Sequence, residues 1–289
     1  MTLSESVQIS GGIMLAFARR KTRVRDLHGL PETLAWAGSL ELKLATSRKD
    51  IRKAQKLRYR VFFEEGGAIP EPYVRLRRRD ICDFDRICDH LVVIDHASPK
   101  RKVVGCYRLL RQEVAQANGG FYSAQEFEIA PLLARHPEKR FLELGRSCVA
   151  PEHRGKRVLE LLWRGLWIYA SHHSCDVMIG CASLPGADAG QHVGALTFLR
   201  DHAAAPDEWR ACALPARRAE LISGPQTEPR RAMAALPPLV KGYLRVGAYF
   251  GDGAVVDRQF GTTDVLVIVP VARIDARYVD HFSAGAMAA

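Results

Sequence analysis

The chain has 289 residues and a formal net charge of +10. Of its residues, 47% are hydrophobic and 26% charged, a composition that predicts a globular protein. No stretch approaches the roughly 18 apolar residues that a membrane-spanning helix needs, and residues 1–20 lack the order of a signal peptide, so we expect a cytoplasmic protein. Seven cysteines, odd in number and scattered along the chain, argue against a disulfide framework.

The beginning of the chain differs from the rest in its pattern. Residues 1–38 mix Gly, Ser, Thr and charged residues without periodicity, which predicts a loosely ordered basic arm. We expect a single domain over residues 39–289. Within it, residues 206–238 are rich in Pro, Ala and Arg and predict a long connection.

The domain opens with a strand and a helix. Leu40–Leu44 alternates between apolar and polar residues, as a half-buried strand does. Ser47 followed three residues later by Asp50 is a helix-capping pattern, and the apolar spacing that follows predicts a helix up to Phe62. This helix would carry Arg58 and Phe62 on one face.

Strands and helices then alternate to the end of the chain. A Gly/Pro-rich loop at 66–72 and an arginine-rich run at 75–79 come first. The elements predicted after them are strands at Leu91–Ile94 and Val103–Leu110, a helix at Gln125–Leu133, a strand from Phe141, a helix at Val158–Tyr169, a strand at Asp176–Cys181, helices at Ala187–Leu199 and Leu239–Phe250, and a strand at Val265–Val271. This order predicts a mixed α/β fold with a central sheet flanked by helices.

The most informative stretch covers residues 141–162. It predicts a buried strand that passes through a basic turn into an apolar helix. Free backbone N–H groups at a helix start, surrounded by cationic side chains, form a binding site for phosphate. The turn residues expected to bind it are Arg154, Gly155, Lys156 and Arg157.

The residues Val149–Lys156, between a strand and a helix, resemble the acyl-donor motif of the GCN5-related N-acyltransferase (GNAT) superfamily. The resemblance implies that superfamily's fold and an acyl thioester as donor. Its usual pattern has small residues where this chain has Arg157 and Leu159, whose side chains would crowd a CoA pyrophosphate. The phosphopantetheine of acyl carrier protein has one phosphate, and the carrier is acidic, so we expect this carrier as donor and no tightly bound cofactor.

Other segments resemble acyl-homoserine-lactone synthases. Leu57–Phe62, Gly105–Leu110 and Glu143–Arg146 are similar to the signature arginines, phenylalanine and glutamate of that family. Its tryptophan would fall near Ala68, and this chain has none there. Asp85 aligns best with its acidic residues.

A longer part of the chain, about residues 38–275, resembles the bacterial ornithine lipid synthases. The similar segments include Phe63–Glu65, Cys82–Asp85, Cys88–Leu91, Lys241–Arg245 and Thr263–Asp264. This resemblance implies transfer of a 3-hydroxyacyl chain from acyl carrier protein to the α-amine of ornithine, a step of membrane lipid biosynthesis. An autoinducer-type synthase and a CoA-dependent N-acyltransferase remain alternatives.

Four residues at the end of the Phe141 strand are candidate catalytic residues. An amine that is protonated at neutral pH must lose a proton to attack a thioester, and Glu143 is the candidate base. A distorted strand end after Gly145 would let the backbone N–H groups of Ser147 and Cys148 stabilise the oxyanion. Arg146 would lie beside them. The alternative for Glu143 is a structural carboxylate paired with an arginine.

Five residues are candidates for substrate binding. Arg108, like Arg146, lies among apolar neighbours and would need an anionic partner, which could be Glu143, Asp85 or the substrate's carboxylate. Asp83 and Asp85 are candidates for binding ornithine's side-chain ammonium, with a solvated acidic loop as the alternative. Arg58 and Phe62 complete the set, although their helix face is also consistent with core packing.

The basic charge predicts an acidic partner without identifying it. The expected partners are acyl carrier protein and ornithine. The helix at 239–250 is a candidate for contact with the inner face of an anionic membrane, with core packing as its alternative. The rival to an enzyme is a non-catalytic adaptor that binds nucleic acid or membrane through the basic clusters at 19–23 and 75–79. We expect no nucleic acid and no metal site, since Cys82, Cys88 and His90 lack zinc-site spacing.

Overall fold

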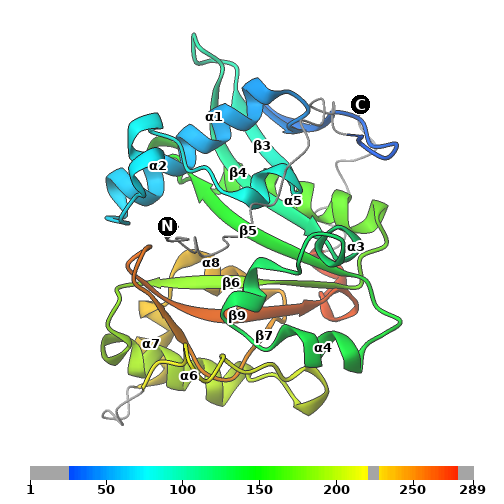
Figure 1. Cartoon of the computed structure of the whole chain (residues 1–289). Coiled ribbons are helices and arrows are strands. Elements are labelled where there is room, and N and C mark those ends of the chain that lie inside the picture. The colour runs from blue at the N-terminus through cyan, green and yellow to red at the C-terminus, as the bar shows by residue number, and fades with distance from the viewer. Residues whose placement is uncertain (1–25, 221–227, 279–289) are drawn as a thin grey trace, which may run out of the picture.

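A computed structural model describes residues 26–220 and 228–278. One mixed sheet of nine strands runs through it with helices packed around it, which confirms the predicted fold class (Figure 1). The sheet order is β1-β2-β3-β4-β5-β6-β9-β7, with β8 also paired to β9. The strands are β1 (Thr33–Ala37), β2 (Leu40–Leu44), β3 (Asp89–Asp95), β4 (Lys102–Arg111), β5 (Phe141–Val149), β6 (Val177–Pro185), β7 (Tyr249–Phe250), β8 (Val255–Asp257) and β9 (Thr262–Pro270).

Eight α-helices and several single turns join these strands within the described residues. The helices are α1 (Arg48–Tyr59), α2 (Pro72–Arg77), α3 (Gln112–Gln116), α4 (Ile129–Arg135), α5 (Lys156–His172), α6 (Val193–Ala203), α7 (Pro229–Ala235) and α8 (Pro238–Arg245). The predicted cap of α1 is confirmed, because Ser47 Oγ accepts a hydrogen bond from the Asp50 N–H at 3.1 Å. A π-helical turn, Arg60–Glu65, extends α1 beyond the predicted end at Phe62.

Helices α1 and α5 cover the half of the sheet formed by β1 to β5. α1 packs against β4 and β5, and α5 packs across β1 to β4 (Figure 1). Gly105 in β4 has no side chain, and this lets Val158 and Leu162 of α5 approach the strand closely. The buried apolar side chains between α5 and the sheet form the largest hydrophobic core among the described residues.

Several boundaries differ from those expected. Strand β1 falls within the predicted arm and pairs with β2, while residues 1–25 of that arm lie outside the described residues. Helix α4 starts at Ile129 rather than Gln125, because Pro131 is compatible with the first turn of a helix and not with its interior. Helix α8 ends at Arg245, since the positive φ of Gly247 turns the chain into β7. The predicted connection at 206–238 contains α7, and its residues 221–227 are not described.

The sheet forks between β5 and β6. These two strands are parallel and pair only from Phe141↔Val177 to Glu143↔Ile179. Beyond that point β5 stays paired with β4 and β6 stays paired with β9, so the two halves of the sheet diverge (Figure 1). Backbone N–H and C=O groups that face the fork are released from the sheet and become available to a ligand.

A β-bulge lies just beyond the fork. Arg146 has a φ of +52°, and the pairing register shifts so that Tyr107 of β4 opposes both Arg146 and Ser147. The predicted distortion after Gly145 is therefore confirmed. Bulges of this kind redirect side chains and backbone donors, and this one lies in the strand that carries the candidate catalytic residues.

Candidate active site

Glu143 occupies the last position at which β5 pairs with β6. Its side chain is buried, and its carboxylate accepts hydrogen bonds from the Tyr122 N–H at 2.9 Å, the Ser123 N–H at 2.7 Å and the Ser123 hydroxyl. Burial raises the pKa of Glu143, and the Ser123 and Tyr122 hydrogen bonds and nearby Arg108 partly offset that effect. Glu143 therefore anchors the 3-10 turn Tyr122–Gln125 and retains capacity for one further hydrogen bond.

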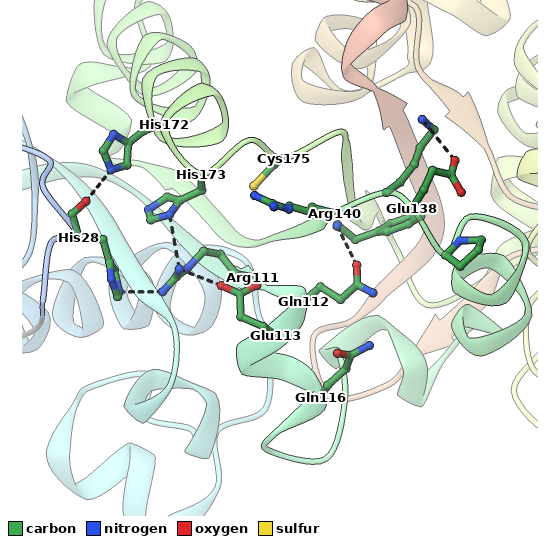
Figure 2. A pocket seen from close by; sticks show the side chains of 13 residues that line it. His28, Arg111, Gln112, Glu113, Gln116, Glu138, Arg140, His172, His173 and Cys175 are labelled. Carbon is green, nitrogen blue, oxygen red and sulfur yellow. Dashed lines mark hydrogen bonds and ion pairs between the residues drawn. The ribbon is translucent and has the colours of Figure 1, made fainter.

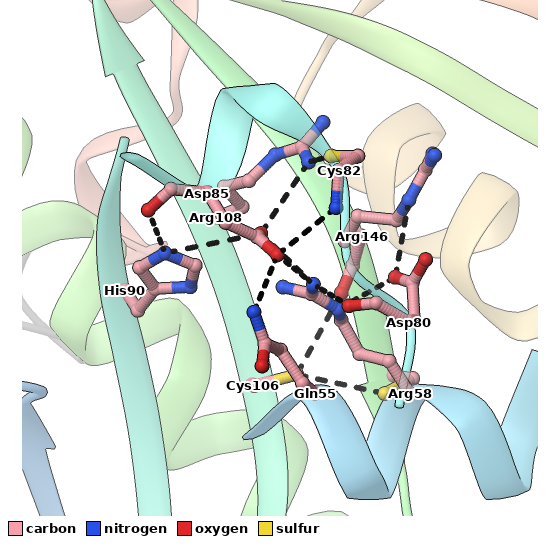
Figure 3. Close-up of polar contacts among 10 residues, drawn as sticks. Gln55, Arg58, Asp80, Cys82, Asp85, His90, Cys106, Arg108 and Arg146 are labelled. Carbon is pink, nitrogen blue, oxygen red and sulfur yellow. Dashed lines mark hydrogen bonds and ion pairs between the residues drawn. The ribbon is translucent and has the colours of Figure 1, made fainter. Parts of the chain in front are cut away.

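A buried network of charged side chains lies above β4 and β5 (Figure 3). Its centre is Asp85, whose two oxygens each accept from Arg58 Nη2 at 2.8 Å. Gln55 Nε2 donates to the same carboxylate at 2.8 Å. Although burial alone would raise it, the guanidinium of Arg58 holds the pKa of Asp85 well below its usual range. Asp85 is thus fully engaged by protein groups.

A second aspartate, Asp80, completes the network. Its carboxylate lies 2.7 Å from Arg58 Nε and 3.4 Å from Arg146 Nε. Arg108 lies 3.7 Å from Asp85. The expectation that Arg108 and Arg146 need anionic partners is confirmed, although sequence reasoning did not identify Asp80, which comes at the end of the arginine-rich run.

Arg146 is held by one carboxylate and two aromatic rings. It shares Asp80 with Arg58, at the longer of the two distances. Its guanidinium carbon lies 4.9 Å from the ring centre of Tyr122 and 4.5 Å from that of Phe260, so the group is held between two aromatic faces. A planar donor group in such a place is suited to bind a carboxylate.

The remaining predicted residues are more dispersed. Asp83 lies on the surface, 3.6 Å from Arg86, and the structure does not bring it into the network. Phe62 is half-buried and contacts the edge of Phe260. Ser147 is half-buried within the bulge, whereas Cys148 is buried with its Sγ 3.5 Å from Cys106. Burial raises the pKa of the Cys148 thiol well above its ordinary value, so that thiol is unsuited to nucleophilic chemistry.

The predicted phosphate-binding turn forms the start of α5. Gly155 is the N-cap in extended conformation, and in the described part of the chain no side chain caps this helix end. Lys156 and Arg157 are exposed in the first turn. Arg154 lies 3.0 Å from Glu65, so the turn adjoins the π-helical extension of α1. The backbone N–H groups at this helix start remain available for a phosphate.

Three carboxylates that sequence reasoning did not bring together lie beyond the Tyr122–Gln125 turn. Oxygens of Glu126, Asp257 and Asp264 all lie within 4.8 Å of one another. Burial and the neighbouring charge of Asp264 raise the pKa of Glu126 to about 7. The only sequence signal was an aspartate in each of two β-branched segments, and neither segment indicates its neighbours in space.

A separate cavity of about 670 Å³ lies at the closed end of the fork (Figure 2). Figure 2 shows Arg111 between His28 and His173, with Gln112 and Arg140 on the opposite wall. No residue predicted for catalysis or binding lines it. We therefore assign the candidate site to the open end of the fork, which carries Glu143, Arg146 and the donor turn.

The helix predicted for membrane contact packs inward. Val240 and Tyr243 of α8 are buried in the main core, and Lys241 Nζ donates to the Ala234 carbonyl. Core packing, the alternative expectation for this helix, is what the structure shows. Across residues 26–220 and 228–278, no helix combines the length and apolar character needed to cross a bilayer.

Comparisons with known proteins show the family to which the chain belongs. Residues 57–164 match the family model described as an acetyltransferase (GNAT) domain. The chain is 50% identical over 260 residues to the L-ornithine N(alpha)-acyltransferase of Rhizobium meliloti strain 1021, covering 88% of each chain. It is 52% identical to the enzyme of the same name from Agrobacterium fabrum strain C58, covering 85% of each. Among solved structures it is similar to FeeM, an N-acyl amino acid synthase from uncultured soil microbes, with a TM-score of 0.46 and 10% identity over 81% of this chain and 91% of that one.

Proposed function

Because this chain belongs to the L-ornithine N(alpha)-acyltransferase family, we propose that it transfers a 3-hydroxyacyl chain from acyl carrier protein to the α-amine of ornithine. The observation that carries the proposal is sequence identity of about one half along most of the chain. The product would be a lyso-ornithine lipid, and the enzyme would act in the cytoplasm. The groups that we propose for this reaction lie around the fork between β5 and β6.

Glu143 is the proposed base. In the reaction, the amine nitrogen forms a bond to the thioester carbonyl carbon, the C–S bond breaks, and the carrier thiol leaves. Glu143 takes the proton that the attacking amine must lose, directly or through one water, and that proton is then available to the departing sulfur. A raised pKa and one unfilled acceptor position suit this carboxylate to the task.

The bulge provides the proposed oxyanion site. As the amine attacks, negative charge develops on the carbonyl oxygen, and preorganised N–H donors stabilise it by about 3 kcal/mol each. Ser147 and Cys148 follow Arg146, whose positive φ turns the backbone out of the regular ladder. Their N–H groups are the proposed donors, and the guanidinium of Arg146 is the proposed partner of ornithine's carboxylate.

The start of α5 is the proposed site for the donor's single phosphate, held by Gly155 with Arg154, Lys156 and Arg157. Arg157 and Leu159 in the first turn leave less room than the small residues that the superfamily pattern has there. That crowding favours one phosphate over a pyrophosphate and therefore favours acyl carrier protein over CoA.

A surface beside this turn is suited to dock the carrier. We define the α2 face as Ile69, Tyr73, Arg75, Leu76 and Arg77. Its apolar members are 64%, 53% and 80% exposed, and both arginines project into solvent. The Glu65–Arg154 ion pair joins the π-helical turn that precedes α2 to the donor turn. An acidic carrier would find both charge and apolar contact here, whereas an anionic membrane is the competing partner of the same face.

The central experiment is reconstitution with purified components. We expect full-length protein, ornithine and 3-hydroxyacyl-carrier protein to yield N-acylornithine by mass spectrometry, with one free carrier thiol per product. Glu143→Gln should lower kcat by about 10²- to 10⁴-fold because the amide cannot accept the proton. Glu138→Gln, an equivalent change at an exposed carboxylate, should leave kcat unchanged.

Separate outcomes contradict separate parts of the proposal. Absence of N-acylornithine with every thioester donor would contradict the acyltransfer itself. Equal kcat/KM with matched 3-hydroxyacyl-CoA would contradict only the choice of carrier protein. Near-normal kcat in Glu143→Gln would exclude that residue as the base. Thermal unfolding of the variant separates lost chemistry from lost structure.

A further inference from the structure

The acidic cluster consists of Glu126, Asp257 and Asp264, which come from three different segments. Glu126 follows the Tyr122–Gln125 turn, Asp257 ends β8, and Asp264 lies in β9 where that strand pairs with both β6 and β8. Glu126 is 2% exposed, Asp264 5% and Asp257 9%. Three buried carboxylates this close repel one another when ionised, so the fold maintains them at a cost unless a proton or another cation is present.

The cluster has unused hydrogen-bonding capacity. Glu126 Oε2 and Asp264 Oδ1 are buried and have no hydrogen-bond partner among the described residues. Cys181 lies close enough to Glu126, and Ser183 and Thr262 close enough to Asp264, to lower the pKa of each carboxyl, but burial outweighs them and both pKa values are raised. In the same part of the chain, no ion pair joins any of the three carboxylates to a basic side chain. Buried acceptors without partners are rare in folded proteins and need a specific explanation.

The dimensions of the cluster suit a primary ammonium group. Three oxygens that lie no more than 4.8 Å apart can all be reached by one nitrogen at about 2.8 Å from each. That is the ordinary length of a charge-assisted N–H···O bond, and an ammonium has three N–H donors for the three acceptors. Divalent metals prefer shorter distances, about 2.0 to 2.6 Å, and six or more oxygen ligands. Asp257 Oδ1 is also already engaged by the N–H groups of Gln259 and Phe260.

The cluster adjoins the proposed reaction centre. Glu143 binds the N–H groups at the start of the Tyr122–Gln125 turn, and Glu126 lies at its end, donating its own N–H to the Ser123 carbonyl at 3.0 Å. A 3-10 turn of four residues rises roughly 8 Å, which is comparable to the reach of a short amino acid side chain. Arg146 lies near enough to act on the charge of Asp264.

We propose that Glu126, Asp257 and Asp264 form the binding site for the side-chain ammonium of ornithine and so select the acceptor. The inference rests on the proposed function and extends it to substrate choice. Ornithine's carboxylate meets Arg146, its α-amine points to Glu143, and its three methylene groups lead to the acidic cluster. Asp85, which the sequence suggested for this ammonium, is already occupied by Arg58 and Gln55.

The test compares ornithine with norvaline, which has the same α groups and three-carbon side chain but no side-chain amine. Using full-length protein and 3-hydroxyacyl-carrier protein, kcat and KM are measured for both acceptors. Loss of one charged hydrogen bond predicts that Asp264→Asn and Glu126→Gln raise the KM for ornithine by about 10- to 100-fold. Norvaline kcat/KM should change less than about threefold. Asp207→Asn, at a fully exposed carboxylate, is the matched control.

A second measurement uses binding without turnover. With no acyl donor present, ornithine should raise the Tm of the unmodified protein and norvaline should not, and Asp264→Asn should abolish the difference. If one variant does not fold, the other decides the result.

Three results would contradict the inference, and a fourth would contradict only the proposed function. An unchanged preference for ornithine in both variants would show that the cluster does not bind its ammonium. Equal loss of norvaline turnover in folded variants would assign the cluster to the chemical step. Activity lost in EDTA and restored by magnesium or calcium would make it a metal site. If the unmodified protein acylates neither amino acid, the proposed function fails, whereas the binding measurement still tests the cluster.

Discussion

At the residue scale, the proposed base depends on a neighbour that its own sequence segment does not reveal. Glu143 is buried, and burial by itself disfavours a charged carboxylate. Ser123 offsets this with two hydrogen bonds, one from its N–H and one from its hydroxyl. The net effect is that the pKa of Glu143 stays above its ordinary value, so its carboxylate has the higher affinity for a proton that a general base needs.

We predict that Ser123→Ala shifts the pH dependence of catalysis. Without the hydroxyl, the pKa of Glu143 rises, because a hydrogen bond that favoured the ionised form is lost. The acid limb of kcat/KM should therefore move to higher pH, by roughly one unit for a bond to a charged group. The measurement is a pH–rate profile with ornithine, with Ser171→Ala on the exposed side of α5 as control. An unchanged limb in Ser123→Ala would mean that Glu143 is not the titrating base.

At the element scale, α2 is a short helix with an unusual surface. Pro72 at its first position suits a helix start, and Val74 alone of its residues is buried. Its apolar residues Tyr73 and Leu76 are 53% and 80% exposed among the described residues, and Arg77 stacks on Tyr73. Such a combination of apolar and cationic groups is typical of an interaction surface.

We predict that the double substitution Arg75→Glu with Leu76→Ser raises the KM for acyl-carrier protein at least about tenfold, because it removes both charge and apolar contact. Acyl-phosphopantetheine lacks the carrier protein, so its kcat/KM should change less than about twofold. Met233→Ser, an exposed apolar residue on α7, is the control. An unchanged KM together with weaker sedimentation on phosphatidylglycerol vesicles would assign the α2 face to a membrane instead.

At the scale of the whole molecule, the charged network joins parts of the fold that are far apart in sequence. Arg58 comes from α1, Asp80 and Asp85 from the segment before β3, and Arg146 from the bulge in β5. Each guanidinium is buried, so each carboxylate is needed to compensate it. The network therefore fixes α1 against the fork and couples the stability of the fold to the geometry of the site.

We predict that Asp85→Ala lowers the free energy of unfolding by about 3 to 5 kcal/mol, because Arg58 keeps a buried charge with one partner fewer. Asp83→Ala, two residues away on the surface, should change it by less than about 0.5 kcal/mol. Urea unfolding at pH 7 measures both. The folded pKa of Asp85 is depressed, so its contribution is present above its unfolded pKa of about 4 and disappears as the pH falls further. If Asp85→Ala lowered the free energy of unfolding no more than Asp83→Ala does, the stabilising role of the network would be contradicted.

The sequence by itself determined the fold class, most strands and the basic turn before α5, and it predicted that Arg108 and Arg146 need anionic partners. Apolar periodicity and short motifs predict local structure, and an arginine within an apolar strand predicts an anionic partner. Tertiary structure alone decided that Asp80 and Asp85 satisfy those arginines, that Ser123 holds Glu143, and that Glu126, Asp257 and Asp264 meet. The physical reason is that partners brought together by long-range strand pairing leave no periodic signal in the chain, since their spacing in sequence is unrelated to their distance in space.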